Sequence, residues 1–218
     1  DTVAAMAECR SVCEHIHLPV QAGSDQVLKR MKRAYSRERY LEKVQMVRDA
    51  IPDVAVTTDI IVGFPGETEE DFDQTLSLVE EARYDAAFTF QYSSRPMTEA
   101  QGMDGHLPKA VVQQRYDRLT HLQEAISSER NAGDVGATHE VIVEGASKKD
   151  PSKLTGRTRT NKLVHFASDG AREGDFRMVS ITGAHAHFLE GMVVGAGNNR
   201  ARMSLPLAAS TSECSSCA

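Results

Sequence analysis

The chain has 218 residues and a formal charge of −6, with 25 Lys and Arg against 31 Asp and Glu. This length allows one large domain or two small ones, and an apolar content of 40% is enough for a sizeable core. No apolar run is long enough to cross a membrane and no signal pattern opens the chain, so the sequence predicts a soluble, cytoplasmic protein without a membrane partner.

The four cysteines lie in two pairs near the ends of the chain, Cys9 with Cys13 and Cys214 with Cys217. This arrangement is not a disulfide framework. Three spaced cysteines could hold an iron–sulfur cluster, but Ile16 stands where a third would be, so we expect no metal site and two structural cysteines at this end. The chain opens in mid-pattern without a Met, which indicates a piece of a longer protein.

The first half of the chain alternates expected strands with expected helices, and a polar loop follows each strand. The strands are expected at 15–20, 54–62 and 86–92, and the helices at 25–33, 36–51 and 69–83. This order is typical of βα units with a parallel sheet. Three strands cannot close a barrel, so the remaining strands are expected upstream of residue 1.

The stretch from Asp59 to Thr68 is the centre of this half. A buried strand ends in Gly63-Phe64-Pro65-Gly66, where Gly and Pro permit a sharp turn. Thr68 is a candidate N-cap for the next helix, with Asp71 at the capping-box position. Turns at the C-terminal ends of parallel strands are where α/β proteins place ligands, although an ordinary βα turn remains an alternative interpretation.

The second half begins with a long amphipathic helix expected at 108–131 and then changes character. Short alternating strands are expected at 140–144, 163–167, 176–181 and 188–194, separated by Gly and Ser turns. This pattern predicts a small antiparallel barrel of about sixty residues. From residue 195 on, the Ala- and Ser-rich composition predicts a disordered tail.

A basic segment lies between the first two of these strands. It is interpreted as a loop that binds RNA phosphates, with a solvated loop as the alternative. Its candidate RNA-binding residues are Lys148, Lys149, Lys153, Arg157, Arg159 and Lys162.

Three ordered motifs at strand ends carry a resemblance to a known family. They are His17-Leu18-Pro19-Val20-Gln21-Ala22-Gly23-Ser24, the 59–68 stretch, and Phe90-Gln91-Tyr92-Ser93-Ser94-Arg95-Pro96. With the basic barrel, they make the chain similar to the radical-SAM methylthiotransferases, over residues 9 to about 194. The resemblance implies half of a TIM-like α/β barrel with a closing helix at 1–134, a small all-β TRAM barrel with an OB-like form at 138–194, and the tail at 195–218.

The resemblance also implies the cofactor S-adenosylmethionine and the partner tRNA. Members of the family insert a methylthio group into an unactivated C–H bond, and the similarity is greatest to the branch that modifies N6-isopentenyladenosine beside the tRNA anticodon. The residues that match the cofactor loops are Gln21, Ser24, Asp59, Gly63, Gly66, Glu67, Tyr92 and Arg95. Met97 and Glu99 depart from the family pattern in the third loop.

The family's [4Fe–4S] clusters are held by cysteines upstream of what this chain contains, so no catalytic residue is assigned here and the chain alone is expected to be inactive. Two alternatives stay open at this point. One is a truncated RNA-binding or scaffold protein that has lost catalysis. The other is the branch of the family that modifies an aspartate of a ribosomal protein, which lacks a basic stretch like 147–161.

Overall fold

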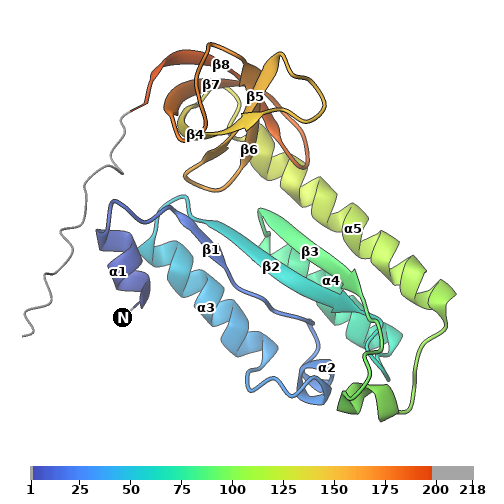
Figure 1. Ribbon diagram of the computed structural model, residues 1–218. Helices are drawn as coiled ribbons and strands as arrows, with labels where there is room; N and C mark the ends of the chain where they lie inside the picture. The colour runs from blue at the N-terminus through green and yellow to red at the C-terminus, as the bar shows by residue number, and fades with distance from the viewer. Residues whose placement is uncertain (1, 198–218) are drawn as a thin grey trace, which may run out of the picture.

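The computed structural model describes residues 2–197 as a three-stranded parallel sheet with helices, a separate β-barrel, and a long helix that joins them (Figure 1). The helices are α1 (Thr2–Glu8), α2 (Asp25–Arg30), α3 (Arg37–Ala50), α4 (Glu69–Ala82) and α5 (Lys109–Ala132), with a 3₁₀ turn at Glu99–Gly102. The strands are β1 (His15–His17), β2 (Ala55–Val62), β3 (Ala86–Gln91), β4 (Thr138–Ala146), β5 (Lys153–Thr158), β6 (Leu163–Ala167), β7 (Phe176–Ala184) and β8 (Leu189–Ala196).

The sheet has the order β1-β2-β3 with every pair parallel, as the alternation of strands and helices predicts. The central strand β2 is apolar on the side that faces α3 and α4, where Val56, Ile60 and Val62 are buried. Thr58 is buried on the same strand because its hydroxyl accepts from the amide of Val20 and donates to the carbonyl of Leu18. A polar side chain therefore fixes the segment directly after β1 against β2.

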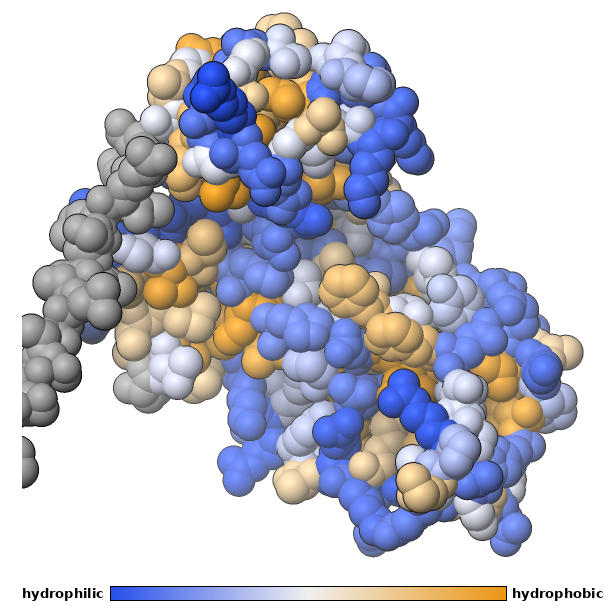
Figure 2. All heavy atoms as spheres, viewed as in Figure 1, coloured by the Kyte–Doolittle hydropathy of each residue, from blue (hydrophilic) through white to orange (hydrophobic). Residues whose placement is uncertain are grey.

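The opposite face of the sheet is uncovered within the described residues. Phe88 and Phe90 of β3 point outward on this face and are 59% and 52% exposed. Figure 2 shows the apolar surface that results, between the barrel and the loops at the strand ends. Exposed aromatic side chains on a parallel sheet are unusual because such sheets are normally covered on both faces. This face therefore agrees with the expectation of an incomplete barrel.

The C-terminal strands form a closed barrel in the order β4-β5-β6-β8-β7. Its core is made of eight buried side chains: Val141, Val143, Leu154, Val164, Phe166, Val179, Ile181 and Leu189. They come from alternate positions of each strand, as the period of two requires. Gly156 lets β5 approach β4 closely, because a Cβ there would lie 2.5 Å from the carbonyl oxygen of Ile142.

The fold class is confirmed, but three details differ from the sequence interpretation. The basic segment is not one loop, because β5 runs through it and pairs with β4 and β6. The barrel is not wholly antiparallel, since β6 and β8 pair parallel. Strand β8 extends to Ala196, so residues 195 and 196 belong to the barrel, and the rest of the expected tail, residues 198–218, lies outside the described residues.

Ion pairs hold the barrel against the N-terminal ends of the parallel strands. Arg159 reaches Glu14, which precedes β1, with nitrogen–oxygen distances of 2.7 and 2.8 Å, and it also donates to the carbonyls of Arg10 and Val12. Lys162 lies 2.7 Å from Asp134 and 3.7 Å from Asp85, the residue before β3. Two cations predicted to bind RNA thus have partners within the chain.

We expect Arg159→Ala to loosen the contact between the barrel and the segment before β1 without unfolding the barrel, because all four acceptors of Arg159 lie in residues 10–14 and none in the barrel core. Amide hydrogen exchange should become several-fold faster in residues 9–14 and stay unchanged in β4–β8. Arg157→Ala is the matched control, since Arg157 on β5 pairs with Glu144 on β4 and so makes its ion pair within the barrel domain. Equal exchange in residues 9–14 for both variants would contradict this role of Arg159.

Candidate functional site

The candidate site lies where β1, β2 and β3 end, because the loops after the three parallel strands meet at that edge. Gln21 follows β1 and continues its pairing with β2: its amide donates to the carbonyl of Asp59, and its carbonyl accepts from the amide of Ile61. Its φ of 70° turns the chain sharply at this point. Directly after β3, the amide of Tyr92 donates to the carbonyl of Val62, which places the third loop beside the second.

A cavity of about 500 Å³ opens at this edge. It is lined by Gln21, Asp59, Ile61, Phe64, Phe90, Gln91, Tyr92, Ser93, Arg95, Thr98 and Ala100. One carboxylate and one guanidinium therefore face a space whose walls are largely apolar and aromatic. Such a space suits a ligand that has an aromatic ring and separate charges of both signs.

Two polar groups of the cavity are available to a ligand. The hydroxyl of Tyr92 is buried and has no hydrogen-bond partner in residues 2–197, while its ring packs edge-on against Phe64 with centroids 5.3 Å apart. The carboxylate of Asp59 has His17 on one side, with Nε2 at 3.4 Å, and remains 29% exposed. A buried hydroxyl without a partner is costly, which favours an acceptor or donor on a bound molecule.

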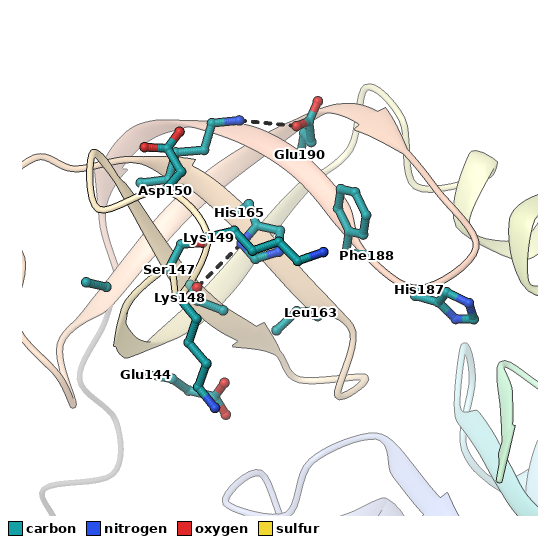
Figure 3. Close-up of a pocket in the computed structure, with 13 residues that line it drawn as sticks. Glu144, Ser147, Lys148, Lys149, Asp150, Leu163, His165, His187, Phe188 and Glu190 are labelled. Atoms are coloured by element: carbon teal, nitrogen blue, oxygen red, sulfur yellow. Dashed lines mark hydrogen bonds and ion pairs between the residues drawn. The ribbon is translucent and has the colours of Figure 1, made fainter.

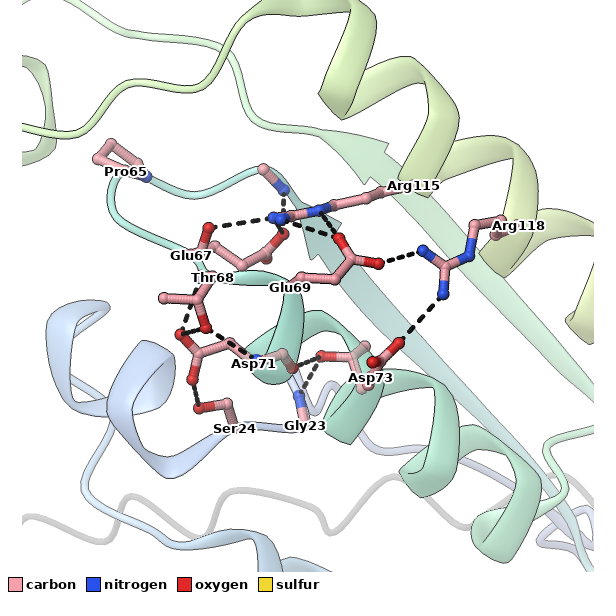
Figure 4. Close-up of polar contacts among 12 residues, drawn as sticks. Gly23, Ser24, Pro65, Glu67, Thr68, Glu69, Asp71, Asp73, Arg115 and Arg118 are labelled. Atoms are coloured by element: carbon pink, nitrogen blue, oxygen red, sulfur yellow. Dashed lines mark hydrogen bonds and ion pairs between the residues drawn. The ribbon is translucent and has the colours of Figure 1, made fainter.

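Beyond Gln21, the loop after β1 is held against α4 and does not line the cavity. Ser24 caps α2 and is fully buried, and its hydroxyl donates to the carboxylate of Asp71 (Figure 4). Gly23 is required there, because a Cβ would overlap the backbone of Thr75. Asp71 also completes the predicted capping box with Thr68. Burial raises the pKa of Asp71, but the hydrogen bonds from Ser24 and Thr68 together lower it by more. The pKa of Asp71 therefore lies below its ordinary value.

The Gly63–Gly66 turn adopts backbone conformations that only glycine takes without strain. Gly63 has a φ of 80° and Gly66 a φ of 75°. A Cβ on Gly63 would lie 2.6 Å from a methyl of Val112 on α5, and one on Gly66 would overlap the guanidinium of Arg30. These glycines therefore shape the turn that carries Phe64 to the cavity.

A buried ion pair ties this turn to α5. Oε1 of Glu67 accepts from the amide of Gly63 at 3.1 Å and from Nη1 of Arg115 at 2.7 Å (Figure 4). The side chains of Glu67 and Arg115 are 2% and 6% exposed. Burial raises the pKa of Glu67, and the hydrogen bond from Arg115 opposes that rise. Arg115 also donates to Glu69, and Glu69 pairs with the more exposed Arg118.

The structure thus separates the eight candidate cofactor residues into two groups. Gln21, Asp59, Tyr92 and Arg95 line one cavity. The other four candidates hold the loops in shape and do not line this cavity. They are Ser24, Gly63, Gly66 and Glu67. Cofactor binding by any of the eight stays a prediction. The sequence analysis did not assign the apolar lining by Ile61, Phe64, Phe90 and Ala100, although the alternating aromatic residues of the third strand were a signal for Phe90.

The six basic candidates are also divided. Lys148, Lys149 and Lys153 line a second cavity, on the barrel. Arg157 pairs with Glu144. Arg159 and Lys162 form the ion pairs, described above, that hold the barrel against the parallel sheet. The RNA-binding role of all six stays a prediction. Lys148 and Lys149 are the strongest candidates, because the other four form ion pairs with carboxylates of the chain.

Side chains that could bind a metal are dispersed in the described part of the chain. In residues 2–197, no three His, Cys, Asp or Glu side chains are grouped so that they could hold a metal ion. Cys9 and Cys13 are free and exposed, and Cys214 and Cys217 lie outside the described residues. None of the described helices is long and apolar enough to cross a membrane.

Comparison with known proteins agrees with the two-part architecture. Residues 1–79 match the Radical SAM superfamily, and residues 134–194 match the TRAM domain. A tRNA-2-methylthio-N(6)-dimethylallyladenosine synthase of Streptomyces viridosporus is 55% identical over 87% of this chain. Synthases with the same name from Mycobacterium marinum and a Thermoanaerobacter species are 53% and 52% identical over 87% and 89% of it.

The chain belongs to the radical-SAM methylthiotransferase family. It spans 38%, 37% and 41% of the length of these three relatives. The family assignment therefore covers the described sheet and barrel, and it agrees with the resemblance seen in the three strand-end motifs.

We expect Glu67→Ala to lower the free energy of unfolding by about 3–5 kcal/mol, because it leaves the guanidinium of Arg115 buried without a counter-charge. Glu67→Gln should cost less, since the amide oxygen can still accept from Gly63 and Arg115. Arg118→Ala is the control, and breaking its half-exposed pairs should cost about 0–1 kcal/mol. Urea unfolding measures all three, and equal costs for Glu67→Ala and Arg118→Ala would show that the buried pair is not structural.

Proposed function

We propose that this chain is the part of a tRNA methylthiotransferase that binds S-adenosylmethionine and RNA. The complete protein would add a methylthio group to C2 of N6-isopentenyladenosine beside the anticodon, which places it in the cytoplasm with its tRNA. The observation that carries the proposal is the convergence of Gln21, Asp59, Tyr92 and Arg95 on one cavity at the strand ends, in a chain 53% identical to a relative named for that reaction.

The lining of the cavity fits S-adenosylmethionine group by group. Phe64 and Phe90 offer apolar and aromatic surface to an adenine ring. Arg95 can hold the carboxylate of the methionine part with two parallel hydrogen bonds. Asp59 favours the positively charged sulfonium or ammonium. When bound, S-adenosylmethionine would supply the radical that activates the C–H bond, after one electron from the family's [4Fe–4S] cluster breaks a C–S bond at its sulfonium.

The residues of this chain then have positioning roles. Asp59 and Arg95 would orient the two ends of the cofactor, and the apolar wall would exclude water from the reacting carbon. Glu67 and Arg115 keep the Gly63–Gly66 turn in the conformation that presents Phe64. The target base must be unstacked to reach this cavity, as the single-stranded loop of a tRNA hairpin allows.

Asp59→Asn tests the cofactor site in the complete protein. We expect it to weaken S-adenosylmethionine more than S-adenosylhomocysteine, because the second ligand has a neutral sulfur in place of the sulfonium. The difference should be roughly tenfold in Kd, the size of one charged contact of about 1.4 kcal/mol. Calorimetry measures both ligands. Asp53→Asn is the matched control, since Asp53 is exposed at the other end of β2. Unchanged binding of both ligands would place the cofactor elsewhere.

Lys148→Ala combined with Lys149→Ala tests the RNA contact. With an anticodon stem-loop as probe, we expect the slope of log K against log salt to flatten by about one to one and a half units, if each lysine meets one phosphate of a single strand. Lys43→Ala, an exposed lysine on α3, should change nothing. If the double variant keeps the wild-type slope, these lysines do not contact the RNA. If the wild-type chain binds no stem-loop, RNA binding is not part of its function.

A further inference from the structure

The barrel carries a second cavity, of about 660 Å³, beside the strands β5, β6 and β8. Three aromatic rings cluster there. The rings of His185 and Phe188 are stacked with centroids 4.3 Å apart, and His165 meets Phe188 edge-on at 5.2 Å. His165, His187 and Phe188 line the cavity itself (Figure 3). None of these residues was a candidate in the sequence analysis.

The charges around the cavity leave two cations free to bind a ligand. Three carboxylates line it, and each has a partner: Glu190 lies 3.3 Å from Lys153, Glu144 lies 3.4 Å from Arg157, and Asp150 accepts from Ser152. In the described part of the chain, neither Lys148 nor Lys149 forms an ion pair. Both ammonium groups are exposed, and Lys149 lies close enough to His165 to affect its pKa.

We propose that this cavity is a binding site for one unstacked nucleotide of the RNA, whose base stacks on Phe188 beside His165 while Lys148 and Lys149 contact its flanking phosphates. Aromatic rings beside free lysines are the combination that single-stranded nucleic acid requires, since every base has a π-face and every linkage has a charge. Burial, and then the charge of Lys153, lower the pKa of His165, which favours the neutral form of its ring beside the base.

This inference rests on the proposed function but concerns a different place from the cofactor cavity. The barrel adjoins the N-terminal ends of the parallel strands through Glu14 and Asp85, whereas the cofactor cavity lies at their C-terminal ends. The nucleotide bound on the barrel is therefore not the one that is modified. It is a second nucleotide that fixes how the RNA lies on the protein.

The absence of tryptophan from the chain allows a direct test. Phe188→Trp creates a single fluorescent reporter at the stacking position. We expect an oligoadenylate of about six nucleotides, within the site sizes known for small barrels, to quench this fluorescence. Polyphosphate of equal charge should not quench it, because it has no base to stack. Quenching by both probes alike would mean that charge alone is recognised, and would overturn the stacking site.

Phe188→Leu keeps apolar volume but removes the ring, and Phe188→Tyr keeps the ring. We expect Leu to weaken oligoadenylate binding roughly 5- to 150-fold, the range of one base–aromatic stack, and Tyr to restore it. Thermal unfolding checks that each variant is folded. Wild-type affinity in the folded Leu variant would overturn the inference, as would displacement of oligoadenylate by an oligoglutamate peptide, which would indicate an acidic protein partner.

The anticodon stem-loop separates the two proposals. If the Leu variant binds the stem-loop as tightly as the wild type does, the stacking site is wrong while the proposed function stands. If the wild-type chain binds neither the stem-loop nor oligoadenylate, both are wrong. A parallel loss of affinity for both probes in the Leu variant, restored by Tyr, is the result that we expect.

Discussion

The buried ion pair between Glu67 and Arg115 is the contact on which the arrangement of the candidate site depends. It joins the turn after β2 to α5, and Glu67 also accepts from the amide of Gly63. Neither charge could remain buried alone, so the turn and the helix must adopt their positions together. The same helix then packs along β3, and near its end Asn131 donates to the carbonyl of His185 in the barrel. One helix therefore fixes both the turn after β2 and the barrel.

The fold could be predicted from the sequence because its elements are locally encoded. The buried run of β2, the capping box at Thr68 and Asp71, and the alternating strands of the barrel each need only neighbours in the chain. Strand β5 could not be predicted in the same way. Its residues from Lys153 to Thr158 are mostly polar, and what makes them a strand is pairing with β4 and β6. The sequence of the basic segment alone therefore predicts a loop.

The candidate site was predictable in position but not in role. Motifs at three strand ends identified Gln21, Asp59, Tyr92 and Arg95, which the structure brings to one cavity. Ser24 and Glu67 belong to the same motifs but have structural partners. Ser24 contacts Asp71, 47 residues away, and Glu67 contacts Arg115, 48 residues away. No local pattern reveals such partners. The rings of His165 and Phe188 likewise meet only because β6 and β8 are neighbours in the closed barrel.

Helix α5 has a further consequence as a rigid spacer. Its 24 residues run from the strand-end loops to the barrel, which corresponds to a length of about 36 Å at 1.5 Å per residue. A ligand that touches both ends gains the avidity of two linked sites, and one that is too short to span them gains nothing. Short or wrongly shaped nucleic acids would engage a single end and dissociate quickly. Under the proposed function, this spacing would select a folded RNA by its dimensions, even where each separate contact tolerates many sequences.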